Sequence, residues 1–253
     1  MYNEFAPTAD TLFLLVLSIL TLESVHSIRF LYQHFLSGIT TKSLNTFYHA
    51  CSYAKVDYSH FMNITAKVAL RMIPDSLATQ PIFLCVDDTM VAKTGTRFEN
   101  VSKLFDHAAH NGSNYLNGHC FVNIMLCIPV WKNDRVSYLS LPLGYRMWQK
   151  KESKLELAAS MIRQVMPEFQ EKKQVIILCD SWYTKRNLVS IVDEYQNLDL
   201  IGNARIDSVM YDPAPAHTGR RGRPAKHGKR LSVETDFAFS NERSEITISE
   251  HTV

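Results

Sequence analysis

The segment IFLCVDDT, residues 82–89, is a continuous apolar run that ends in two aspartates. A second segment of the same form, VIILCDS, covers residues 175–181. Continuous β-branched and aliphatic runs are typical of strands that are buried on both faces of a sheet. Open α/β sheets place their ligands at the carboxyl ends of such strands. The two segments therefore predict an α/β fold in which Asp88 and Asp180 end neighbouring strands.

The whole chain is predicted to have three parts. Residues 1–79 carry apolar side chains at helical spacing, which predicts a helical N-terminal region. Residues 80–205 form the predicted core, with elements in the order β-β-β-α-β-α-β. Residues 206–253 are predicted to form a basic loop and a partial β insertion. The core elements are expected as strands at 82–87, 119–130, 136–143, 174–180 and 198–204, helices at 151–166 and 184–197, and a loop with a short helix at 89–118.

The composition is that of a folded domain without a membrane span. Apolar residues make up 46% of the 253 residues and charged residues 21%, so a sizeable core is expected and disorder is not. The most apolar run, residues 12–22, is about half of the ~20 residues that a span requires, and is expected to be a buried helix. Five cysteines without CxxC spacing argue against a zinc ribbon and favour a reducing cytosol.

Basic residues gather in one stretch of the chain. The net charge is only +2, but residues 220–230, RRGRPAKHGKR, hold six lysines or arginines and no acid. Such a run repels itself unless an anion is near, and each phosphate that it neutralises adds salt-dependent affinity. The alternative is a solvated surface loop. The predicted DNA-binding residues are Arg220, Arg221, Arg223, Lys226, Lys229 and Arg230, together with Lys185 and Arg186 after the second aspartate.

Two carboxylates at neighbouring strand ends suit a divalent metal ion. Magnesium prefers oxygen ligands and keeps several waters, so one or two protein carboxylates suffice. We therefore predict Asp88 and Asp180 as metal ligands for Mg²⁺ or Mn²⁺. Asp87 is expected to point to the opposite face, because side chains alternate along a strand. The alternative is that each aspartate only caps the turn or helix that follows it.

These motifs resemble those of DDE-type insertion-sequence transposases with a ribonuclease-H-like core. VDDT at residues 86–89 resembles the first catalytic motif of that family, and LCDSWY at residues 178–183 the second. GHCFVNIMLCI at residues 118–128 resembles its second core strand, and residues 211–230 resemble the basic, proline-containing start of its β insertion.

The resemblance carries expectations about fold and chemistry. It implies a ribonuclease-H-like mixed sheet with flanking helices, with Asp88 and Asp180 as catalytic residues. It implies metal-dependent cleavage of DNA at the ends of an insertion sequence, followed by attack of the freed 3′ hydroxyl on target DNA. The implied cofactor is Mg²⁺ or Mn²⁺. The implied partner is double-stranded DNA, and no membrane is involved. A homodimer is one possible assembly, and the implied location is the bacterial or archaeal cytoplasm, at the nucleoid.

One part of the family pattern is missing from the chain. The family's third acid is a glutamate on a helix beyond the β insertion, in a Tyr-x2-Arg-x3-Glu-type pattern. No such pattern occurs before Val253, and Glu242, Glu245 and Glu250 lie in a segment that is predicted as strand or loop. The chain therefore resembles a transposase that ends before its last catalytic element.

Three other functions remain open at this point. A transposase relic would keep the fold and the basic loop and bind DNA without cleaving it. A plain α/β binding module would use Asp88 and Asp180 only as caps. An aspartyl-phosphate phosphatase would need a second acid two positions after its nucleophile, where this chain has Met90.

Overall fold

The computed structural model describes residues 6–54, 56–95, 97–105, 114–169, 173–204, 208–216, 225–232 and 235–236. The chain divides into two compact units, Met1–Ile64 and Thr65–Val253. Each unit is described by itself below. The functional boundary that the sequence places after residue 79 stays a prediction.

The first unit is helical, as the apolar spacing predicts. Its core is formed by Leu15, Leu31, Leu36 and Phe47, one from each of four helical segments. Serine side chains start two of the helices by accepting a backbone N–H bond, which satisfies donors that a helix leaves free at its first turn. The segments are α1 (Ala6–Thr21), α2 (Ile28–Leu31), a π-helical turn (Tyr32–Leu36), α3 (Ser37–Ile39) and α4 (Leu44–Tyr53).

Helix α1 corrects one expectation. The apolar run at residues 12–22 forms a helix, but the helix is not buried on all sides. Leu15 is buried, whereas Phe13 is 65% exposed and Leu20 is 79% exposed. A small helical unit offers a helix one packing face, so Leu12 and Leu14 pack at the border of the core while Phe13 and Leu20 stay at the surface. Within the described ranges, no helix is both long enough and apolar enough to cross a membrane.

The second unit is built on a mixed sheet. β1 pairs antiparallel with β3 and parallel with β5, and β5 pairs parallel with β6. Both β2 and β4 pair antiparallel with β3, along different stretches of it. Three long antiparallel strands followed by two parallel ones give the ribonuclease-H-like sheet that the resemblance implies. The strands are β1 (Ile82–Ala92), β2 (Ser102–Phe105), β3 (Tyr115–Lys132), β4 (Arg135–Met147), β5 (Val175–Cys179) and β6 (Leu198–Gly202).

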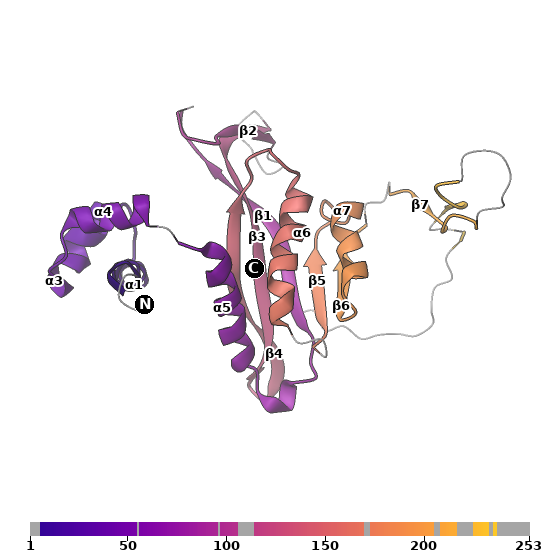
Figure 1. The fold of residues 1–253 in the computed structure, drawn as a ribbon, viewed down its shortest axis with the longest axis horizontal. Coiled ribbons are helices and arrows are strands. Elements are labelled where there is room, and N and C mark those ends of the chain that lie inside the picture. The colour runs from indigo at the N-terminus through magenta and orange to yellow at the C-terminus, as the bar shows by residue number, and fades with distance from the viewer. Residues whose placement is uncertain are drawn as a thin grey trace. The chain divides into compact units, whose positions relative to one another are not determined.

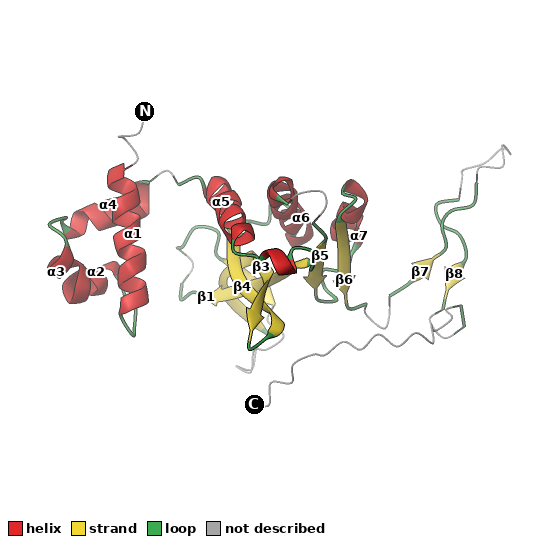
Figure 2. Ribbon diagram, turned by 90° about the horizontal axis from the view of Figure 1, so that it is seen from below, coloured by secondary structure: helices red, strands yellow, loops and turns green. Residues whose placement is uncertain are grey.

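Two helices cover one face of this sheet. Figure 2 shows α6 (Lys154–Val165) and α7 (Arg186–Val189) on the same side of the strands. Ser153 and Glu156 form a capping box that starts α6, and the helix then buries an apolar face that includes Met161 and Ile162. A further helix, α5 (Tyr58–Arg71), precedes the sheet in the chain.

Several predicted elements of the core differ from the structure. β1 continues to Ala92 and β3 begins at Tyr115, so both strands extend into the stretch that was expected as loop. Residues 102–105, expected as loop, form β2, because Leu104 is buried and pairing with β3 outweighs a polar local sequence. The helix expected at 184–197 shrinks to α7 and a 3₁₀ turn (Ser190–Glu194). Its first residues are held in a turn after Asp180, and branched side chains at Val189, Ile191 and Val192 weaken an α-helix.

A small two-stranded sheet follows the core. β7 (Met210–Tyr211) pairs antiparallel with β8 (Arg230–Leu231), so the chain on either side of the basic stretch is joined by a β ladder. The further strands expected up to residue 249 lie outside the described residues.

Candidate active site

The two predicted aspartates lie on neighbouring parallel strands, but only Asp180 directly follows the end of its strand. The expectation that Asp88 ends a strand is wrong, because β1 continues to Ala92 through its pairing with β3. The β1–β5 ladder runs from Ile82 opposite Val175 to Val86 opposite Cys179. Asp180 is the first residue beyond the ladder on β5, and Asp88 lies two residues beyond it on β1. The two strands are labelled β1 and β5 in Figure 1. The register therefore places both residues just beyond the same end of the β1–β5 ladder, next to the carboxyl end of β5, and open α/β sheets bind their ligands at the carboxyl ends of their strands.

Alternation along β1 separates the two adjacent aspartates. Ile82, Leu84 and Val86 are buried on one face of the strand, and Asp88 continues that face as a half-buried residue. Asp87 is exposed on the opposite face, and its Oδ1 accepts the Asp88 backbone N–H at 2.7 Å. Only Asp88 therefore lies on the side that α6 covers.

Two side chains hold the Asp88 carboxylate. The Cys120 Sγ–H donates to Asp88 Oδ2 at 3.1 Å, and Lys154 forms an ion pair with the same oxygen. Burial, followed by this hydrogen bond to Asp88, raises the pKa of the Cys120 thiol to about 12, so the thiol stays neutral and donating. Asp88 and Lys154 are only 16% and 14% exposed, so their attraction is poorly screened by water.

Lys154 was not predicted from the sequence. It is the first residue of α6, directly after the Ser153 cap. A helix N-terminus normally favours acidic side chains, because the helix dipole is positive there. A lysine at the first position of a helix is therefore unusual, and this is the one signal in the sequence that could have identified Lys154 as a site residue.

Asp180 also acts as a cap. Its Oδ1 accepts the backbone N–H groups of Trp182 at 3.0 Å and Tyr183 at 3.2 Å, which folds the chain into the turn that precedes α7. The alternative that Asp180 caps the following turn is thus confirmed for its Oδ1 atom. No hydrogen bond to Oδ2 is found within the described ranges, and the residue is exposed. Asp180 can therefore cap the turn and still offer an oxygen to a ligand.

Tyr183 lies within electrostatic reach of both carboxylates. Its side chain is fully buried, and its hydroxyl finds no hydrogen-bond partner among the residues that the structure describes. Burial, and then the negative charges of Asp88, Asp87 and Asp180 among others, raise the pKa of the phenol. Tyr183 therefore packs into the core beneath the aspartates rather than lining a DNA path.

The predicted DNA-binding residues have different outcomes. Lys185 and Arg186 are exposed at the start of α7, next to the Asp180 turn. Lys226, Lys229 and Arg230 are also exposed, and Lys229 forms an ion pair with Asp236, which neutralises part of the basic stretch. Arg220, Arg221 and Arg223 lie outside the described residues, as do Glu242, Glu245 and Glu250.

Asp88 and Asp180 offer oxygen donors of the kind that a magnesium-type ion prefers, and their role as ligands stays a prediction. One or two protein carboxylates are enough for such an ion, because it keeps several waters and also binds a substrate phosphate. Within the described residues, no group of three His, Cys, Asp or Glu side chains is arranged for metal binding. An ion at Asp88 would have to share that carboxylate with Lys154 or displace it.

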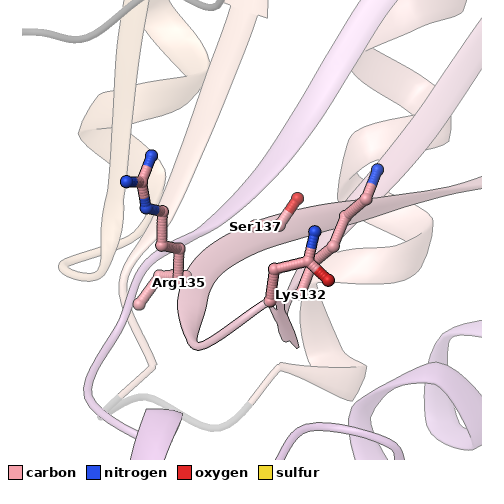
Figure 3. A pocket seen from close by; sticks show the side chains of 5 residues that line it. Lys132, Arg135 and Ser137 are labelled. Carbon is pink, nitrogen blue, oxygen red and sulfur yellow. The ribbon is translucent and has the colours of Figure 1, made fainter.

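A separate pocket lies at the tip of the β3–β4 hairpin. It has a volume of about 420 Å³ and is lined by Lys132, Asn133, Arg135, Val136 and Ser137 (Figure 3). Its residues flank the last pair of the β3–β4 ladder, Lys132 opposite Arg135, whereas Asp88 lies opposite Val122 near the other end of β3. This pocket is therefore at the far end of the sheet from the two aspartates.

Comparisons with known proteins identify related sequences and structures. A family model described as "DDE superfamily endonuclease" matches residues 8–248. No curated protein shows significant sequence similarity to the chain.

Two solved structures illustrate the structural similarity. The Drosophila P element transposase strand transfer complex matches 80% of this chain and 42% of its own, at 9% identity and a TM-score of 0.35. The Mos1 strand transfer complex matches 78% of this chain and 58% of its own, at 13% identity and a TM-score of 0.24. The chain thus spans about half the length of these transposase chains.

Proposed function

The chain belongs to the family of DDE superfamily endonucleases, and on this premise we propose that it is the catalytic core of an insertion-sequence transposase. Its first reaction would be hydrolysis of a phosphodiester at each element end. Its second would be attack of the freed 3′ hydroxyl on a phosphodiester of the target DNA, which joins the element to the target. In both reactions an oxygen attacks phosphorus and the P–O bond opposite to it breaks. Because the two displacements share this geometry, one set of carboxylates can serve both.

The observation that carries this proposal is the register of β1 and β5. It pairs two segments that are far apart in the sequence, so that Asp88 and Asp180 both follow the paired part of neighbouring strands. Asp88 and Asp180 would hold Mg²⁺ or Mn²⁺, which when bound activates water and stabilises charge on phosphate oxygens. The protein contributes orientation, since Cys120 holds Asp88 and the Trp182 and Tyr183 amides hold Asp180.

A transposase relic that binds DNA without cutting it is the second candidate. It is favoured by the Asp88–Lys154 ion pair, since the carboxylate already has a cation partner, and by the lack of a three-residue metal cluster in the described part of the chain. DNA binding would then depend on the basic residues alone.

A nicking assay separates the two candidates. The 253-residue protein is incubated with supercoiled plasmid in Mn²⁺ or Mg²⁺, and in EDTA as the control. We expect open-circular product only with the metal. Binding without nicking would support the relic instead, and neither binding nor nicking would reject both.

A further inference from the structure

Three lysines and two tryptophans meet beside Asp88. We propose that this lysine–tryptophan cluster (Trp148, Lys150, Lys154, Trp182 and Lys185) binds the phosphodiester backbone of the DNA strand that enters the site. The inference rests on the proposed function, because it assigns the surface that positions the substrate of the same two aspartates. It adds Lys150, Lys154 and both tryptophans to the predicted contacts.

The lysine head groups lie over the tryptophan rings. The Nζ atoms of Lys154 and Lys185 are each 4.5 Å from the centroid of the Trp182 ring. Those of Lys154 and Lys150 are each 5.7 Å from the centroid of the Trp148 ring. Cation–π attraction at such distances holds an ammonium group in place. The rings therefore act as supports that fix the lysine charges before a ligand arrives.

The rings are anchored to the residues that hold the carboxylates. The Trp148 backbone N–H donates to the Cys120 carbonyl at 2.8 Å, and its indole N–H donates to the Glu152 carbonyl at 2.7 Å. Cys120 also contacts Asp88. The Trp182 N–H donates to Asp180 Oδ1. The cluster is thus tied to both aspartates and cannot be displaced from them without breaking these contacts.

The cluster carries excess positive charge. Because Lys154 and Lys185 both lie 4.5 Å from one ring centroid, their nitrogens are separated by at most twice that distance. Lys154 is neutralised by Asp88, whereas no ion pair is found for Lys150 or Lys185 in the part of the chain that the structure describes. Asp88 already offsets the charge of Lys154, so Lys150 and Lys185 are the cluster lysines whose charges can attract a further anion. A phosphate of the substrate strand is the anion that the proposed reaction brings to this edge.

Two local conflicts in the sequence are explained by the same role. Lys150 has φ of 61°, a left-handed conformation that costs energy for a side chain with a Cβ. Lys154 places a positive charge in the first turn of α6, against the helix dipole. Features that disfavour the local structure are expected where they serve a site. The first feature places a lysine over the Trp148 ring, and the second places a lysine against Asp88.

The geometry favours phosphate contact over base stacking. A base would have to displace an ammonium group to stack on Trp182, which has two such groups near its ring. A phosphate can instead contact the ammonium groups while they remain over the rings. Binding through phosphates is independent of sequence and falls steeply with salt.

The test measures DNA binding as a function of salt. A fluorescently labelled duplex oligonucleotide is titrated with the wild-type chain, Lys150→Met, Lys185→Met and the control Lys132→Met, by anisotropy at several NaCl concentrations. Lys132 is an exposed lysine at the far hairpin and loses the same charge. We expect the slope of log K against log salt to fall by about 0.9 for each cluster lysine that contacts a phosphate, and not for Lys132→Met. Thermal melting confirms that each variant is folded.

The outcomes distinguish this inference from the proposed function. If the wild type binds DNA and Lys150→Met and Lys185→Met both keep its slope and affinity, the cluster is not a phosphate-binding surface, while the proposed function stands. If the wild type binds no DNA, both fail. Lys154→Met is reserved as a second variant, because it leaves the half-buried Asp88 without its cation. A loss of binding only in this variant would assign the lysine to holding Asp88 and would overturn the phosphate role.

Discussion

Asp88→Asn is expected to lower metal-dependent DNA nicking by about 10²- to 10³-fold, the loss typical for one group that stabilises developing charge. The substitution removes the charge and leaves the size of the side chain unchanged. Asp87→Asn is the matched control, because it makes the same change one residue away on the exposed face of β1. We expect this control to nick DNA within about threefold of the wild type, because Asp87 is exposed on the opposite face of the strand and its asparagine Oδ1 can still accept the Asp88 backbone N–H.

Asp180→Asn refines the same experiment. Asparagine keeps an oxygen that can accept the Trp182 and Tyr183 N–H groups, so the turn before α7 should survive. A loss of nicking in this variant therefore reports on the missing charge and not on the cap. If Asp87→Asn were as damaging as Asp88→Asn, or if Asp180→Asn nicked at the wild-type rate, the assignment of these two carboxylates would be wrong.

Ile177→Ala is expected to lower the free energy of unfolding by about 2–5 kcal/mol. Ile177 is fully buried in β5 and lies opposite the fully buried Leu84 of β1, in the ladder that brings the aspartates together. Truncation leaves a cavity that close-packed neighbours can fill only in part. Urea unfolding followed by circular dichroism measures the change.

The control for this variant lies on the neighbouring strand. Ile201 of β6 is 60% exposed, so Ile201→Ala should cost far less, about 0.5 kcal/mol. Equal losses in the two variants would contradict the placement of β5 at the centre of the sheet. A large loss of unfolding free energy in Ile177→Ala alone would support the pairing of β1 with β5, on which the site depends.

The sequence predicted the two apolar strands that lead to Asp88 and Asp180, but not the full length of β1 or the pairing between strands. The apolar runs before Asp88 and Asp180 predicted β1 and β5, because continuous branched residues leave few alternatives to a buried strand. They could not give the register, which depends on contacts between segments 92 residues apart. β2 was missed for the same reason, since four residues with one buried leucine form a strand only through pairing with β3.

The contacts of the site show a similar division. Asp180 follows a strand and precedes a turn, and both its proposed ligand role and its capping role could be predicted from that position. Lys154 and Cys120 come from α6 and β3, and nothing in their spacing points to Asp88. The roles of Trp182 and Tyr183 also required the structure, because adjacent aromatic residues face opposite environments there.

The most direct test of the account is Mn²⁺ binding to the protein in the absence of DNA, measured by calorimetric titration for the wild type, Asp88→Asn, Asp180→Asn and the double variant. If both carboxylates hold one ion, each single variant should bind Mn²⁺ at least about 10-fold more weakly. The double variant should then lose less than the sum of the two single effects, because ligands of one ion are coupled. Wild-type Mn²⁺ affinity in both single variants would contradict the shared metal site.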